Sequence, residues 1–235
     1  MHNYIIINGK SSDLINGLLI QNLPPITKPQ QRAQIEEIDG RDGDLIDFLG
    51  YAAYDKSFDV GLYGNYCINK ILDYFNISGT VTFSNEPDKF YYFTSLSQID
   101  FNRLLRFKTA TVTMHVQPFK YSLVDKLKSF TISSSPATIE IRNNGNFYSL
   151  PTLKIFGSGT VAVALNATTI FTINLANDEY IVLDCQLLEA YKGATLKNRS
   201  VLGNYDDFRL QPGVNYVTFT GSVSQVEFTN FSRWI

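Results

Sequence analysis

The second half of the chain consists of short β-branched and aromatic runs, each closed by turn residues such as Asn, Asp and Gly. Many short alternating segments of this kind are typical of an antiparallel β-sandwich. Eight strands suffice for two packed sheets, and we expect them at residues 138–142, 152–156, 160–165, 169–175, 180–184, 187–191, 215–219 and 224–231. The run Gly157-Ser158-Gly159 falls between two of them, where it predicts a hairpin turn.

The first half contains apolar residues at helical spacing. Ile68, Ile71 and Phe75 fall on one stripe, which predicts a helix over residues 65–75 that Asn76 ends. A second helix is expected over residues 97–107.

A strand is expected over residues 107–117, where apolar and polar side chains alternate and Pro118 then breaks the pattern. The polar run Ser133-Ser134-Ser135-Pro136 predicts a domain boundary. We therefore expect a mostly β protein, with an N-terminal β-rich α+β domain at residues 1–132 and a C-terminal β-sandwich at residues 133–235.

The charge balance excludes one broad class of partner. The chain has 20 Lys and Arg against 22 Asp and Glu, a net charge of -2, and neither half is strongly basic. Sequence-independent nucleic-acid binding needs clustered basic residues, so we expect none. We see neither a secretion signal nor an apolar run long enough to cross a membrane, so we expect no membrane insertion. Cys67 and Cys185 are expected to be free thiols.

No catalytic pattern stands out. His2 and His115 are the only histidines, and no Gly-x-Ser-x-Gly elbow or phosphate-binding loop is present. The acidic turn around Asp39 does not fit the helix-loop-helix calcium pattern, because its third residue is Arg41 and its sixth is Asp44 instead of Gly. We therefore expect no metal, no cofactor and no enzymatic activity, although two carboxylates would suffice for a glycosidase.

Several short stretches follow one another in a characteristic order. They are Ile38-Asp39-Gly40-Arg41-Asp42-Gly43-Asp44, Gln117-Pro118-Phe119-Lys120-Tyr121, Asn143-Asn144-Gly145-Asn146 with Leu150-Pro151-Thr152-Leu153-Lys154-Ile155-Phe156-Gly157, and Leu210-Gln211-Pro212-Gly213-Val214-Asn215 with Arg233-Trp234-Ile235. In this order the chain resembles the distal tail protein of long-tailed siphophages, the Dit-type tail hub, over nearly its whole length.

The resemblance implies a structural role in the virion. The N-terminal domain would form a homo-hexameric ring around the tail channel, and the C-terminal domain would be a sandwich similar to galectins and carbohydrate-binding modules. One ring face would meet the tail tube protein and the other the tail-associated or baseplate proteins, while DNA passes through unbound. The chain would be made in the bacterial host cytoplasm and would reside at the tail tip.

Two charged stretches are candidate contact residues in such a ring. The acidic set is Asp39, Asp42, Asp44 and Asp47, and the basic set is Arg103, Arg106 and Lys108, continued by Lys120, Lys126 and Lys128. Opposite charges can meet across the two different surfaces of a head-to-tail ring. Alternatively, the carboxylates line the channel and repel passing DNA.

The alternative function is that of a carbohydrate-binding module, in which the C-terminal sandwich binds a host-surface saccharide. The His-x-Asn-Pro-Arg stretch of galectins is absent, so we assign no sugar contacts. A likeness of fold does not by itself carry function.

Overall fold

The chain divides into two compact units. The structure, a computed structural model, describes residues 2–40, 42–94, 99, 105–125, 127–176 and 178–235. The first unit is residues 1–120 with Ile235, and the second is residues 121–234. The boundary expected after residue 132 lies past the short strand Lys128–Thr131, which belongs to the second unit.

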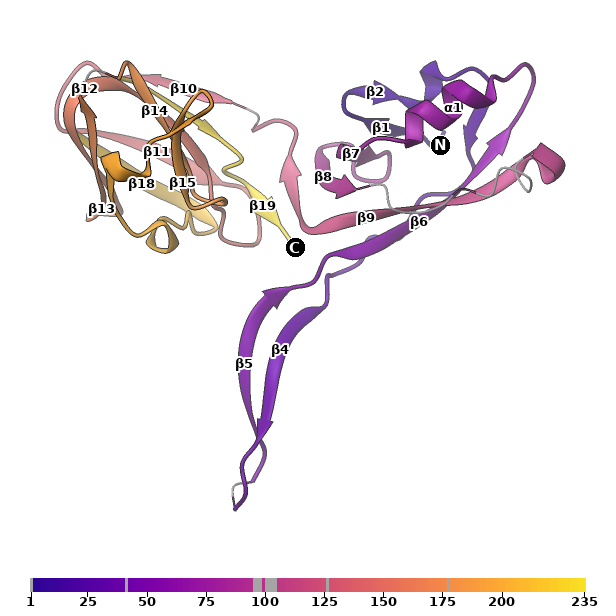
Figure 1. The fold of residues 1–235 in the computed structure, drawn as a ribbon, viewed down its shortest axis with the longest axis horizontal. Helices are drawn as coiled ribbons and strands as arrows, with labels where there is room; N and C mark the ends of the chain where they lie inside the picture. The colour runs from indigo at the N-terminus through magenta and orange to yellow at the C-terminus, as the bar shows by residue number, and fades with distance from the viewer. Residues whose placement is uncertain (1, 41, 95–98, 100–104, 126, 177) are drawn as a thin grey trace. The chain divides into compact units, whose positions relative to one another are not determined.

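The first unit is built on one antiparallel sheet with the order β2-β1-β7-β8-β9-β6-β3, beside which β4 and β5 form a separate two-stranded ribbon (Figure 1). Its elements are β1 (Ile5–Ile7), β2 (Lys10–Ser11), η1 (Ser12–Leu14), β3 (Leu18–Ile20), β4 (Gln31–Glu37), β5 (Asp44–Tyr51), β6 (Tyr54–Leu62), α1 (Ile68–Phe75), β7 (Gly79–Phe83), β8 (Lys89–Thr94) and β9 (Thr109–Ser122).

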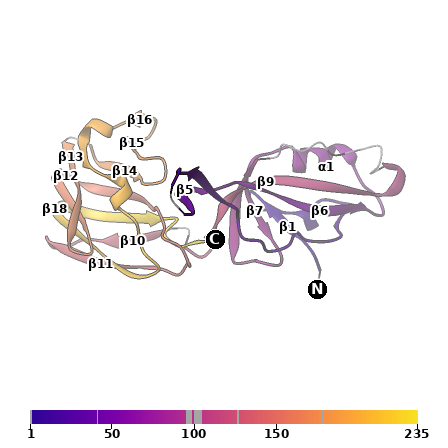
Figure 2. The same ribbon diagram turned by 90° about the horizontal axis from the view of Figure 1, so that it is seen from below.

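Helix α1 confirms the helix that the apolar stripe predicts. Ile71, Tyr74 and Phe75 are buried and join the core of the sheet, so α1 covers one sheet face (Figures 1 and 2). Asn76 ends the helix, and its amide donates to the carbonyl of Leu72. An eight-residue helix is marginal by itself, so packing of this stripe stabilises it. Of the second expected helix, residues 105–107 are helical, and residues 97, 98 and 100–104 lie outside the described part of the chain.

Strand β9 confirms the expected alternation but is longer than expected. Ala110, Val112, Met114 and Val116 are all buried in the core. The prediction that Pro118 breaks the strand is wrong. The pairing of β9 with β6 ends at Val116, so the amide that proline lacks is not needed for that ladder.

The second unit contains a nine-stranded sheet with the order β10-β18-β12-β14-β15-β16, to which β11, β13 and β17 add (Figure 2). Its elements are β10 (Lys128–Thr131), β11 (Ala137–Asn143), β12 (Thr152–Leu165), β13 (Thr168–Ala176), β14 (Tyr180–Asp184), β15 (Glu189–Lys192), β16 (Thr195–Leu196), η2 (Asn198–Ser200), β17 (Val201–Gly203), η3 (Tyr205–Asp207), β18 (Gly213–Thr229) and β19 (Arg233–Trp234).

Two long strands, β12 and β18, join the two halves of this sheet. The start of β12 pairs with β14 and its end with β13, while the start of β18 pairs with β11 and its end with β10. Side chains from both halves, among them Leu153, Val163, Phe219 and Phe228, enter one core. The sheet therefore curls around a single apolar interior.

The expected break of this strand pair into four shorter strands is wrong. Gly157-Ser158-Gly159 is a bulge inside β12, because the pairing with β18 shifts register on both sides of Ser158. A Cβ on Gly157 would lie 2.1 Å from the carbonyl oxygen of Ser222, so only glycine permits this backbone approach. Gly221, which falls between the two strands expected at residues 215–219 and 224–231, likewise lies inside β18.

The mostly β class expected from the sequence is confirmed. The galectin likeness of the second unit stays a prediction. Cys67 is exposed and Cys185 is buried, and both are free thiols.

Candidate assembly surface

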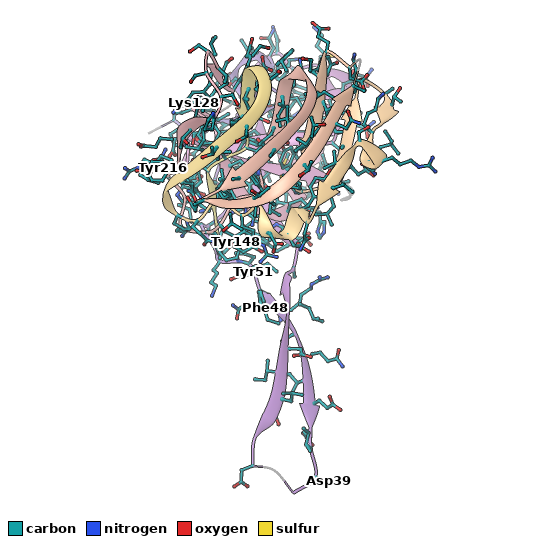
Figure 3. All side chains as sticks on the ribbon, turned by 90° about the vertical axis from the view of Figure 1, so that its left-hand side faces the viewer. Asp39, Phe48, Tyr51, Lys128, Tyr148 and Tyr216 are labelled. Carbon is teal, nitrogen blue, oxygen red and sulfur yellow. The ribbon has the colours of Figure 1, made fainter. Side chains whose placement is uncertain are left out.

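The most exposed element of the first unit is the ribbon of β4 and β5, which we call the arm (residues 31–51). Its strands pair antiparallel from Gln31 opposite Tyr51 to Glu37 opposite Asp44. The connecting tip contains Gly40 and Gly43, both at positive φ, where a side chain would be strained. Figure 3 shows Asp39 at the tip and Phe48 and Tyr51 nearer the base.

The register gives the arm one face that is apolar except for the pair Glu37 with Asp44 at its tip end, and one mainly polar face. Directly opposed residues in an antiparallel pair point to the same side, and the side alternates along each strand. The pairs Ala33 with Phe48 and Ile35 with Ile46 thus share one face. The other face carries the pairs Gln34 with Asp47 and Glu36 with Leu45.

The apolar face is open to solvent. Ile35 is 62% exposed, Ile46 63% and Phe48 55%. An isolated two-stranded ribbon is marginally stable in water, and contiguous exposed apolar groups mark interaction surfaces. The arm therefore has the chemistry of an element that packs against another protein surface.

A proline-rich strap (residues 22–30) fixes the base of the arm. Its carbonyls accept hydrogen bonds from Asn85, in the turn between β7 and β8, and from Lys56 of β6. Asn85 Nδ2 donates to the carbonyl of Pro24 at 3.0 Å, and Lys56 Nζ donates to that of Pro25 at 2.8 Å. The amide of Ala52 donates to the carbonyl of Gln30 and closes the base of the ribbon.

Lys56 belongs to a buried charged network. Its side chain lies 5.0 Å from the ring centre of Tyr91, and Tyr91 donates its hydroxyl to Glu86 at 2.8 Å. The second carboxylate oxygen of Glu86 pairs with Lys120 Nζ at 2.8 Å. The pKa of Lys56 is lowered to about 8, mainly by burial; Glu86 opposes this shift and Lys120 adds to it. The network ties the strap to β6, β8 and β9.

We expect the stability of the first unit to rise with pH because of Lys56. Its folded pKa of about 8 lies below the ordinary value of 10.5, so between these pH values the unfolded chain binds a proton that the folded chain has released. Over this window the free energy of unfolding of wild type should rise by about 3 kcal/mol relative to that of Lys56→Met. Urea unfolding at pH 7, 8, 9 and 10 measures it, and a difference that stays constant across the window would contradict the assignment.

The arm brings the expected acidic residues together. Asp39 and Asp42 lie at the tip, Asp44 starts β5, and Asp47 lies on the face opposite Ile46. All are exposed. Among the described residues, no group of three or more acidic, His or Cys side chains is arranged to hold a metal ion.

The expected basic residues are only partly described. Arg103 and Lys126 lie outside the described residues. Arg106 lies over the ring of Phe107, and Lys108 Nζ lies 4.5 Å from the ring centre of Tyr66. Lys120 is buried against Glu86, so its place in a basic surface is wrong. Within the described chain, no ion pair joins Arg106 or Lys108 to a carboxylate of the arm.

The sequence patterns that we considered did not predict the apolar face of the arm, because they concerned only the carboxylates of this segment. Two signals could have found it. Asp39-Gly40 and Asp42-Gly43 are hairpin dipeptides, and Ile35, Ile46 and Phe48 occupy alternate positions of the runs on either side.

The fold is that of solved phage tail proteins. The chain matches the Dit protein (gp 19.1) of phage SPP1, described as a paradigm of the hub adsorption apparatus in phages that infect Gram-positive bacteria. The TM-score is 0.70 at 15% identity, and the match covers 100% of each chain.

A second match is to a chain of the phage P2 baseplate in its activated conformation with Ca. The TM-score there is 0.50 at 10% identity, over 100% of this chain and 99% of the other. No family model and no curated protein matches the sequence. The expected resemblance to siphophage distal tail proteins is thus confirmed at the level of the fold. In the described residues, no helix is both long and apolar enough to cross a bilayer.

Proposed function

We propose that this chain is a structural hub of a siphophage or prophage tail tip. Six copies form a ring through which DNA passes, and the ring joins the tail tube protein to tail-associated or baseplate proteins. The observation that carries the proposal is the full-length match in fold to the SPP1 hub protein. This match supports a role in assembly at the tail tip.

The arm supports this proposal independently. A head-to-tail ring needs two different complementary surfaces on each subunit. An exposed ribbon with an apolar face supplies one of them, and its carboxylates at Asp39, Asp42, Asp44 and Asp47 add charge. In the ring, these carboxylates meet basic side chains of the neighbour, with Arg103, Arg106 and Lys108 as candidates.

The test is the mass of the purified chain. Light scattering coupled to size exclusion should give six times the 26.5 kDa of one chain, and negative-stain images of the same peak should show six-fold rings. A chain that stays monomeric at its highest soluble concentration contradicts the ring. Saccharide binding by the second unit stays a separate prediction, which a glycan array with the full chain would test.

A further inference from the structure

A groove of about 540 Å³ lies in the first unit between α1 and the segment that contains β1, β2 and η1. Its buried lining includes Ile7, Ile15 and Tyr74. The Tyr74 hydroxyl lies 3.1 Å from the carbonyl oxygen of Ile5 and 3.0 Å from that of Lys10. These contacts fasten α1 to β1 and β2, so the groove is formed before anything binds.

The rim of the groove is apolar where a soluble surface would normally be polar. Leu14 is 71% exposed and Ile77 43% exposed, one on each side of the groove. Exposed apolar side chains around a preformed hollow with an apolar floor mark a binding site for apolar groups. The groove therefore suits an occupant that presents a few large aliphatic or aromatic side chains.

The charges at the rim select among such occupants. Lys10 and Lys70 are exposed, and neither pairs with a carboxylate among the described residues. Asp73 is the acidic residue of the lining. Two lysines against one carboxylate favour an occupant whose apolar groups are flanked by acidic residues.

The arm of a second copy has both properties. Its apolar face carries Ile35, Ile46 and Phe48, and six carboxylates against two arginines lie between residues 31 and 51. Because those three side chains are exposed, the arm is not seated in a groove of its own chain. A Cβ on Gly17, the loop residue next to the groove residue Asn16, would lie 2.5 Å from the Cβ of Tyr66, the residue that Lys108 contacts. That end of the groove thus adjoins a further cation for an acidic arm.

We propose that the groove between α1 and β1-β2-η1 binds the apolar face of the arm of a neighbouring copy. This proposal rests on the proposed ring, and it names the surface that receives the arm. It makes the first unit self-sufficient for head-to-tail contact, because each copy carries one arm and one groove.

Cross-linking tests the contact directly in the full chain. The background is Cys67→Ser, because Cys67 is exposed while Cys185 is buried. Ile46→Cys on the arm and Ile77→Cys on the groove rim are combined, and a short bis-maleimide is added. We expect a denaturing-gel ladder that reaches six chains. The matched control combines Ile46→Cys with Leu202→Cys, a residue that is 72% exposed in the second unit, and should give no ladder.

A charge reversal gives a second readout. Lys70→Glu should raise the concentration at which the ring half-dissociates by about tenfold, with a weaker effect at high salt. Arg199→Glu makes the same charge change on an exposed residue of the second unit and should leave assembly unchanged.

The outcomes separate the two proposals. Suppose that rings of normal mass form, that the cross-linked variant gives no ladder, and that Lys70→Glu assembles as Arg199→Glu does. This result would overturn the proposed binding of the arm in the groove and leave the proposed ring intact. A wild-type chain that stays monomeric, together with no ladder from the double-cysteine variant, would overturn both. Circular dichroism of each variant checks that it is folded, and Lys70 on the exposed side of α1 leaves the core untouched.

Discussion

Placing aspartate at both Ile46 and Phe48 is expected to convert the proposed rings into single chains. Each side chain contributes about 1.5–3 kcal/mol when it is buried against a neighbour, and a carboxylate in its place would have to be desolvated. Light scattering should then give a mass of 26.5 kDa. The variant should remain folded, because neither residue belongs to the core of the first unit.

The matched control is Leu45→Asp. Leu45 is an apolar residue of the same strand, but its register partner is Glu36, so it lies on the polar face. Rings should persist in this variant. If Leu45→Asp dissociates the ring as fully as the double change, added charge on the arm is responsible and the apolar face has no special role.

Charge reversal at Asp42 and Asp44 separates the two roles open to the acidic residues. If the carboxylates meet basic groups of a neighbour, Asp42→Lys with Asp44→Lys weakens assembly, and more so at low salt. Unchanged mass at both salt concentrations would contradict this contact and favour a position along the channel.

Glu86→Gln is expected to produce the largest loss of stability in the first unit. Glu86 is the buried carboxylate that pairs with Lys120 and accepts from Tyr91, and Lys56 lies in the same network. Without its charge, a buried ammonium group is left uncompensated, which costs about 3–5 kcal/mol. Denaturant unfolding followed by circular dichroism, with hydrogen exchange over residues 109–120, would measure the loss.

Two further variants make this result specific. Adding Lys120→Met to Glu86→Gln removes the uncompensated charge and should restore most of the stability. Asp88→Asn breaks an ion pair with Lys89 whose carboxylate is 59% exposed, and should cost less than about 1 kcal/mol. A loss for Glu86→Gln as small as that for Asp88→Asn would show that the buried pair contributes little.

The sequence predicted those elements whose apolar period is unbroken. The stripe of Ile71 and Phe75 predicted α1, and the alternation around Val112 and Met114 predicted most of β9. Local patterns of this kind report which face of an element is buried. The mostly β class followed from the same evidence.

The errors arose where glycine and proline act inside a strand. Gly157 and Gly159 were interpreted as a turn because both occur in turns, but here they permit a bulge at which β18 comes close to β12. Pro118 was interpreted as a strand end, although the pairing of β9 with β6 ends at Val116 and the missing amide interrupts no bond of that ladder. Pairing partners that are distant in the sequence decide these cases, and no local window contains them.

The candidate assembly surface was also predicted only in part, because the sequence does not show which residues are paired across the fold. The acidic cluster from Asp39 to Asp47 was found because charge is visible residue by residue. Lys120 was assigned to a basic surface because its neighbours are basic, but it is buried by its pairing with Glu86, which is far away in the sequence. Ile46 and Phe48 were passed over, because the segment was interpreted as an acidic turn.

The acidic composition of the arm also bears on what happens before assembly. Each arm strand pairs on one side only within the described chain, so its other edge offers unpaired backbone groups to any strand that approaches. Exposed edges with apolar side chains are where chains aggregate. Two arms that approach each other bring together Glu36, Glu37, Asp44 and Asp47 from both copies, and like charges so placed repel. In the proposed ring subunit, this repulsion is expected to oppose fibrous self-association before the arm meets a groove.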